Sequence, residues 1–146
     1  MKIINGNTDI YFNDAYAIRK EVFMDEQGFS SELDDIDKIA THVILYDNDK
    51  PIATGRIYQE NGEYHIGRIC VLQTYRKNHL ASKVMKTLEE IGFKQTDTIY
   101  LSAQLQAKGF YEKLGYLAYG DEYMDEHCPH IMMKKRGCKK INSSRK

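Results

Sequence analysis

The stretch LQTYRKNHLASKVMKTLEEI, Leu72–Ile91, decides how this chain folds, because an apolar strand-like run ends where it begins and a helix follows a short polar turn. Its apolar residues recur at three- to four-residue spacing, which predicts a core-facing helix over residues 79–93. Turns that hold a phosphate at a helix N-terminus usually carry glycine, yet none lies between Gly67 and Gly92. The stretch predicts either an anion-binding turn whose glycine has been replaced or a plain polar connection.

Helix and strand patterns alternate on both sides of this stretch. Upstream we expect a helix over residues 9–25, capped by Asn7 or Thr8, and downstream a short helix that ends at Gly115. The expected strands cover residues 42–46, 52–59, 64–72, 98–103, 116–120 and 130–135. The turn Asn61–Gly62 indicates a hairpin, so the first three strands form an antiparallel meander. This order predicts an α+β fold with three layers, a mixed and mostly antiparallel sheet flanked by helices.

The composition indicates an ordinary globular chain. With 146 residues, 42% of them hydrophobic and 29% charged, it is long enough for one domain with a real core. No apolar run approaches the roughly 20 residues that span a bilayer, and the first residues lack the apolar core of a signal peptide. We therefore expect a cytoplasmic protein with no membrane partner. The three cysteines predict no disulfide framework, and the segment HCPH (127–130) does not match the spacing of a metal site.

Basic residues are concentrated at the C-terminus. The segment KKRGCKKINSSRK holds seven basic side chains and no acidic one, so residues 1–133 carry 14 basic against 21 acidic side chains. Without periodicity or interleaved aromatic residues, the segment is typical of a disordered tail. We predict a single domain over residues 1–135 and a basic, disordered tail over residues 136–146. Nucleic-acid binding by the tail is a less favoured alternative.

Several motifs resemble, in this order and spacing, the core of the GNAT superfamily of N-acetyltransferases. They are the strand IGRICVL, the turn QTYRKNHLA with the helix after it, the strand IYLSAQ and the segment GFYEKLGY. The segments IRKEVFMDEQGFSSELDDIDKIATHVI and PHIMMKK look like the small bacterial ElaA/YjcF-type branch. The resemblance covers about residues 1–135 and implies a central sheet that is splayed between its two central strands.

The resemblance implies that acetyl-CoA, as co-substrate, binds at this splay with its pyrophosphate on the turn before the second long helix. The family pattern there is Arg or Gln, two residues, Gly, one residue, then Gly or Ala. It falls on Arg76, His79 and Ala81, so a histidine stands where the first glycine is usual. The free N–H groups of a helix start still favour an anion, and we expect an altered but retained cofactor turn. The expected cofactor-binding residues are Ile69, Cys70, Val71, Arg76, Lys77, Asn78, His79, Leu80, Ala81, Ser82 and Gln104.

Acetyl transfer needs an oxyanion donor, an acid for the leaving thiolate and a base for the amine. The resemblance gives the Val71 amide as the oxyanion donor and Tyr111, a phenol with an ordinary pKa of about 10, as the acid. Tyr111 is alternatively a core residue. Many family members carry a glutamate where this chain has Gly67. The bases left open are His42 and His130 on expected strands and a water relay to Glu26 or Glu32.

We expect an N-acetyltransferase that passes the acetyl group of acetyl-CoA to a primary amine of a small molecule or peptide in a ternary complex. The alternative is a non-catalytic acyl-CoA-binding or regulatory module, which the residues at Gly67 and His79 favour. Seven acids with no base among them favour a cationic amine: Glu21, Asp25, Glu26, Glu32, Asp34, Asp35 and Asp37. The sequence leaves a homodimer open.

Overall fold

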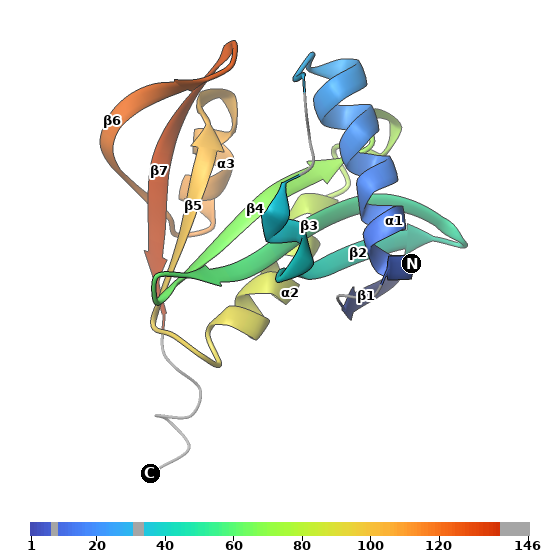
Figure 1. The fold of residues 1–146 in the computed structure, drawn as a ribbon, viewed down its shortest axis with the longest axis horizontal. Helices are drawn as coiled ribbons and strands as arrows, with labels where there is room; N and C mark the ends of the chain where they lie inside the picture. The colour runs from blue at the N-terminus through green and yellow to red at the C-terminus, as the bar shows by residue number, and fades with distance from the viewer. Residues whose placement is uncertain (7–8, 31–33, 138–146) are drawn as a thin grey trace. The chain divides into compact units, whose positions relative to one another are not determined.

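The computed structural model describes residues 1–6, 9–30 and 34–137. Its strands are β1 (Lys2–Gly6), β2 (Thr41–Asp47), β3 (Lys50–Glu60), β4 (Glu63–Val71), β5 (Thr98–Gln104), β6 (Leu117–Asp125) and β7 (Cys128–Arg136). They are hydrogen-bonded in the order β1-β2-β3-β4-β5-β7-β6 (Figure 1). The pair β4–β5 is parallel, whereas β1–β2, β2–β3, β5–β7 and β6–β7 are antiparallel. The predicted mixed, mostly antiparallel sheet is confirmed.

The helices complete the predicted alternation. They are α1 (Asp9–Arg19), the π-helical η1 (Lys20–Glu26), the 3-10 segments η2 (Asp35–Lys38), η3 (Gln73–Tyr75) and η4 (Leu105–Ala107), α2 (Leu80–Gly92) and α3 (Lys108–Lys113). The elements fall into two compact units. The first holds residues 1–58 and 67–88, and the second holds residues 59–66 and those from 89 onward. None of the helices that the structure describes is long and apolar enough to cross a membrane.

In the first unit, α1 and α2 pack on opposite faces of β2 and β3 (Figure 1). Gly55 marks the α2 face, because a Cβ there would lie 2.4 Å from Ile69 and 2.8 Å from Leu88. A side chain at this position would push the helix off the sheet. On the α1 face, the ring of Phe12 lies 5.7 Å from the ring of His42. In both layers the β2 and β3 core side chains are almost entirely buried.

Two elements of this unit differ from the sequence-based prediction. The helix expected over residues 9–25 is α-helical only to Arg19 and then continues as the π-helix η1, where the Gln27 N–H donates to the Val22 carbonyl at 3.0 Å. Strand β1 was not predicted, because its five residues are too few to show a period. The expected caps Asn7 and Thr8 lie outside the described residues.

The hairpin from β3 to β4 turns at Asn61 and Gly62, which have φ values of 53° and 81°. Two successive left-handed residues make the type I′ turn that the Asn-Gly pair predicted. The parallel ladder between β4 and β5 joins three residue pairs, Tyr64–Ile66 with Ile99–Leu101, while β4 runs on to Val71. A ladder this short agrees with the expected splay of the two central strands.

In the second unit, β7 lies between β5 and β6, and the inner sheet face is buried at Ile99, Leu101 and Met133. Tyr116, which follows α3, is buried with them. The expected strands over residues 116–120 and 130–135 are confirmed, although both extend further. Strand β6 is at the sheet edge and is mostly exposed. Most of the predicted basic tail, residues 138–146, lies outside the described residues.

Candidate functional site

The turn between β4 and α2 keeps a glycine-like backbone without glycine. Lys77 and His79 have φ values of 75° and 59°, in the left-handed region that glycine occupies most readily. The His79 carbonyl accepts a hydrogen bond from the Lys83 N–H at 3.3 Å, so His79 stands directly before the first turn of α2. His79 thus has a backbone conformation that glycine adopts most readily.

The first turn of α2 can serve an anion through its backbone. Leu80 is buried and anchors the helix in the core, whereas His79 in front of it is exposed. The N–H groups of Leu80, Ala81 and Ser82 precede the first intrahelical donors, and they carry the positive end of the helix dipole. Asn78 supports the turn by donating from Nδ2 to the Tyr75 carbonyl at 3.3 Å. These features fit a pyrophosphate group.

Arg76, the first residue of the family pattern, is engaged by a carboxylate and a carbonyl. Its Nη1 and Nη2 each donate to a different oxygen of Glu26 at 2.7 Å, and its Nε donates to the Val71 carbonyl at 3.0 Å. The hydrogen bonds from Arg76 hold the pKa of the Glu26 carboxyl below its usual value. Arg76 therefore connects the cofactor turn to the end of β4 and to the end of η1.

The strand before the turn has a left-handed residue at Arg68, whose φ is 56°. Ile69 faces α2, because a Cβ added at Gly55 on that face would meet the Ile69 side chain. Arg68 lies on the opposite face, where its Nη2 donates to Asp34 at 3.3 Å. Cys70 and Val71 end the strand and are buried.

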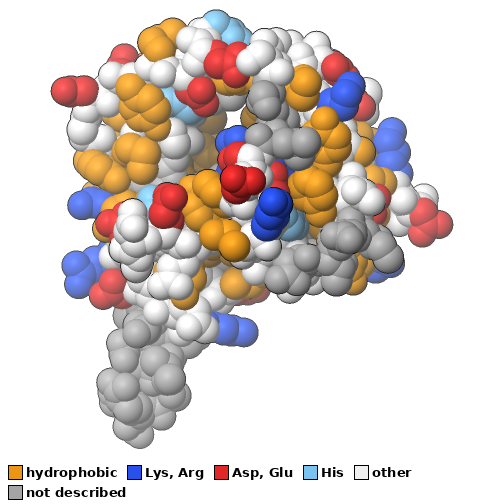
Figure 2. Space-filling view, viewed as in Figure 1, with side chains coloured by type: hydrophobic (Ala, Val, Ile, Leu, Met, Phe, Trp, Pro, Cys, Tyr) orange, Lys and Arg blue, Asp and Glu red, His pale blue; other side chains and the backbone are white. Residues whose placement is uncertain are grey.

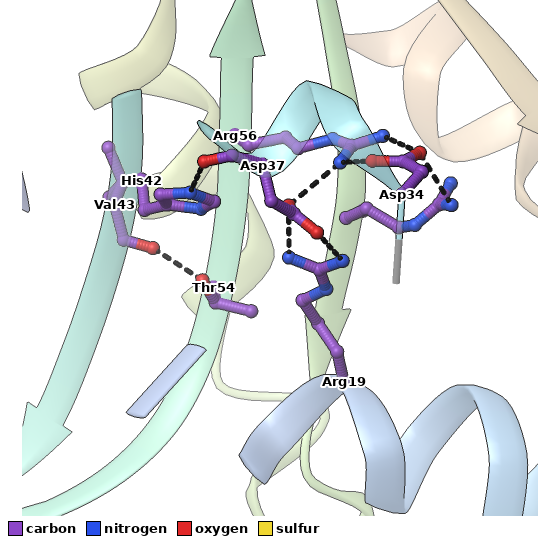
Figure 3. A network of polar contacts seen from close by, with 8 residues as sticks. Arg19, Asp34, Asp37, His42, Val43, Thr54 and Arg56 are labelled. Atoms are coloured by element: carbon purple, nitrogen blue, oxygen red, sulfur yellow. Dashed lines mark hydrogen bonds and ion pairs between the residues drawn. The ribbon is translucent and has the colours of Figure 1, made fainter. Parts of the chain in front are cut away.

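Three arginines and two aspartates form a polar network on the α1 face of the sheet (Figure 3). Asp37 of η2 accepts hydrogen bonds from Arg19 Nη1 and Nη2 at 2.7 and 3.0 Å and from Arg56 Nη1 at 2.8 Å. Asp34 accepts from Arg56 Nη1 and Nη2 at 2.7 and 2.9 Å. Burial alone would raise the pKa of both carboxyls, but the arginines outweigh it and hold each pKa below its usual value. The network ties η2 to α1 and β3.

His42, a candidate base, lies at the edge of this network (Figure 3). Its side chain is buried, and its Nε2 lies 3.2 Å from the Asp37 carbonyl oxygen, which makes Nε2–H the donor. Burial lowers the pKa of His42, so the imidazole is neutral at pH 7. Its Nδ1 is buried and has no hydrogen-bond partner among the described residues. This environment favours a structural role over proton transfer with an incoming amine.

Gly67, where many family members have glutamate, leaves room beside Arg56. A Cβ on Gly67 would have one neighbour within 4 Å, Arg56 Nε at 3.9 Å. That Nε is buried and also has no hydrogen-bond partner among the described residues. Gly67 therefore supplies no carboxylate at this position, and a base must come from another residue.

The second unit holds the remaining predicted residues. Tyr111 of α3 is buried and packs edge-on against Phe110 and Tyr116, with ring centroids 5.0 and 6.0 Å away. Gln104 ends β5 and is the register partner of His130 on β7. His130 is buried, with Nδ1 2.9 Å from the Cys128 carbonyl, and stacks on Tyr123 at 5.9 Å.

The acidic segment between Glu21 and Asp37 is largely neutralised. Besides the pairs of Glu26, Asp34 and Asp37, Asp25 lies 3.5 Å from Lys20 and Asp35 lies 3.7 Å from Lys38. Figure 2 shows acidic and basic side chains mixed over the visible face. Glu32 lies outside the described residues. Five of the seven acids are thus in ion pairs, which weakens the electrostatic basis for expecting a cationic amine.

Arg19 and Arg56 were missed as site residues, although the sequence holds a signal for each. Arg19 falls on the apolar stripe of its helix beside Ile18 and Val22, and Arg56 interrupts the apolar strand IATGRIY. A charged residue at a core position indicates a buried partner. The partners are on η2, a segment without period, and sequence alone does not show which acid they meet.

The chain was compared with known proteins. A family model for the acetyltransferase (GNAT) domain matches residues 13–137. YjcF of Bacillus subtilis strain 168, an uncharacterized N-acetyltransferase, is 33% identical over 139 residues, which cover 92% of this chain and 99% of YjcF. The crystal structure of Escherichia coli ElaA is similar with a TM-score of 0.85 at 22% identity, covering 92% of this chain and 99% of ElaA.

A solved structure with bound ligand has the same fold. The crystal structure of aminoglycoside 6'-N-acetyltransferase complexed with coenzyme A has a TM-score of 0.73 at 18% identity, covering 93% of this chain and 97% of that chain. At such identities this structure and ElaA show the fold, and the family model and YjcF show the relationship. The resemblance inferred from the motifs is confirmed: the chain belongs to the GNAT acetyltransferase family.

Proposed function

We propose that the protein is an acetyl-CoA-dependent N-acetyltransferase that acts on a primary amine of a small molecule or peptide in a ternary complex. The observation that carries the proposal is the left-handed backbone of His79, with φ of 59°, directly before α2. It keeps the turn in the shape that a glycine would give, so the N–H groups of the first helical turn stay available to a pyrophosphate.

The residues for acetyl-CoA fall into two groups. Lys77 to Ser82 would bind the pyrophosphate, mainly through backbone N–H groups, with the charges of Arg76 and Lys77 beside them. Ile69, Cys70 and Val71 of β4 would pair with the pantetheine arm, and Gln104 would contact it from β5. A member of this fold class is known with coenzyme A, which supports an acyl-CoA as the donor.

Two groups would act on the reaction itself. When bound, acetyl-CoA supplies a thioester with an electrophilic carbonyl carbon and a thiolate leaving group. The Val71 N–H would donate to the carbonyl oxygen as negative charge develops there. Tyr111 would give its phenolic proton to the thiolate as the carbon–sulfur bond breaks, and it would regain a proton from the nitrogen that becomes the amide.

Turnover with substitution of Tyr111 tests this proposal. The native protein is expected to release free thiol from acetyl-CoA when a reactive primary amine is added, and to give an amine that is 42 Da heavier by mass spectrometry. Tyr111→Phe should lower kcat about 10²- to 10⁴-fold while the Kd of acetyl-CoA stays within about twofold. Tyr119→Phe, at an exposed tyrosine of the same unit, is the matched control and should leave kcat unchanged.

The second candidate is a non-catalytic acyl-CoA-binding module, which the lack of a carboxylate at Gly67 favours. It predicts acetyl-CoA binding without thiol release by any amine. The same assay therefore separates the two candidates. An acceptor amine with further positive charge stays a prediction, since five of the seven acids are in ion pairs. The cytoplasmic location, the single domain and the homodimer stay predictions.

A further inference from the structure

Among the described acids of residues 21–37, Glu26 has a partner unlike the others. Asp25, Asp34, Asp35 and Asp37 pair with cations of α1, η1, η2, β3 or β4. Glu26 pairs instead with Arg76, which belongs to the turn before α2. If a pyrophosphate binds this turn, Arg76 has a second anion to bind. The cations that pair with the other acids lie outside the turn.

The Arg76–Glu26 pair has the geometry with which an arginine also binds a phosphate group. Both terminal nitrogens of Arg76 donate to Glu26 at 2.7 Å in a fork, the arrangement by which arginine also binds phosphate oxygens. The pair is about one-third exposed, with 37% of the Arg76 and 33% of the Glu26 side chain open to solvent. Exchange of one anion for another at this guanidinium therefore needs little desolvation.

Glu26 also lies close to the end of β4. The Arg76 Nε donates to the Val71 carbonyl at 3.0 Å, so one guanidinium group contacts both Val71 and the Glu26 carboxylate. Val71 carries the amide to which we assign the oxyanion. The Glu26 carboxylate, once free of Arg76, can face an amine that approaches the same end of the strand.

From these contacts we propose that Glu26 is the general base of the proposed acetyl transfer and that Arg76 masks it until acetyl-CoA binds. When acetyl-CoA binds, its pyrophosphate accepts the hydrogen bonds that Arg76 donates to Glu26 in its absence. The freed Glu26 carboxylate then binds the ammonium group of the acceptor. One proton then passes from the ammonium nitrogen to the Glu26 carboxylate, and the neutral amine that results is the nucleophile. Glu26 returns this proton to solvent after the products leave. The inference rests on the proposed function.

Two observations support Glu26 as a masked base. No carboxylate is present at Gly67, and the described carboxylate next to Val71 through Arg76 is Glu26. While the pair is closed, the hydrogen bonds from Arg76 keep the pKa of Glu26 low and make it a weak base. Loss of Arg76 to another anion removes these bonds, so the base is strengthened when the donor is in place.

The test is Glu26→Gln, measured by acetyl-CoA calorimetry and by amine turnover. Removing the competitor of the pyrophosphate should tighten acetyl-CoA binding about two- to fivefold, the range of an exposed ion pair. Removing the base should lower kcat/KM for the amine about 10²-fold or more. These opposite changes from one substitution separate the proposal from a structural role, which would weaken both quantities. Asp25→Asn, at the neighbouring acid paired with Lys20, is the control and should change neither more than twofold.

Each result decides one claim. Weaker or unchanged acetyl-CoA binding by Glu26→Gln overturns the masking, and unchanged turnover overturns the base. If the native protein acetylates no amine, the proposed function and the base fall together. The change in acetyl-CoA affinity then still decides whether Glu26 competes for Arg76.

Discussion

At the scale of single residues, His79 has the left-handed backbone of a glycine at a position where the family pattern has glycine. Left-handed backbone costs a residue with a Cβ roughly 1–2 kcal/mol relative to glycine. The strain at His79 is local, since its side chain is exposed and the helix after it is held by the buried Leu80. The conformation of the turn before α2 is therefore maintained by its surroundings and not by the residue in it.

This strain predicts that His79→Gly stabilises the protein. Relief of the left-handed backbone should add about 0.5–1 kcal/mol to the free energy of unfolding, after the larger chain entropy of glycine in the unfolded state is subtracted. Urea unfolding measures the change. The matched control is Lys86→Gly, at an exposed position inside α2, which should destabilise by about 1 kcal/mol. A loss of stability in His79→Gly as large as in the control would contradict the left-handed assignment.

His42 predicts a pH dependence of stability. Its folded pKa is lowered, chiefly by burial, while in the unfolded chain it is about 6.5. As pH falls below about 6.5, the unfolded chain takes up a proton that folded His42 does not, so stability present above this pH is lost. The free energy of unfolding should fall less steeply between pH 7.5 and 5 in His42→Gln than in the native protein. Equal slopes would show that His42 titrates normally in the fold.

At the scale of elements, η2 is fixed to α1 and β3 by charge. Asp37 accepts three hydrogen bonds from two arginines whose side chains are 1% and 3% exposed. An arginine with so little solvent contact depends on its carboxylate, because removal of one partner leaves a buried charge. The segment before β2 is thus held by a few ion pairs, whereas α2 is held by an apolar stripe.

Asp37→Asn is therefore expected to destabilise the protein by about 3–5 kcal/mol, the range for breaking a buried ion pair. Chemical denaturation monitored by circular dichroism gives the value. Asp35→Asn, two residues earlier, is the control, since the Asp35 side chain is 99% exposed and its lysine 3.7 Å away; it should stay within about 0.5 kcal/mol. Similar losses in both variants would mean that the network does not hold η2.

At the scale of the whole molecule, the sequence predicted the elements better than the contacts between them. Helix α2 was predicted from its apolar stripe Leu80, Val84 and Leu88, and the β3–β4 hairpin from the Asn61–Gly62 turn. Both signals are local in the sequence. The order of β7 between β5 and β6 was not predicted, because the pairing of strands has no local signal. The pairing of Arg76 with Glu26, 50 residues apart, has no local signal, and neither has the left-handed φ of His79.

The proposed function requires that the turn before α2 binds acetyl-CoA. Calorimetric titration of the native protein with acetyl-CoA tests this most directly. We predict one site per chain with a Kd in the micromolar range, about −8 kcal/mol. Binding should weaken when the left-handed backbone is made unfavourable by His79→Val, a β-branched residue that rarely adopts it. A folded native protein that binds no acetyl-CoA would contradict the account.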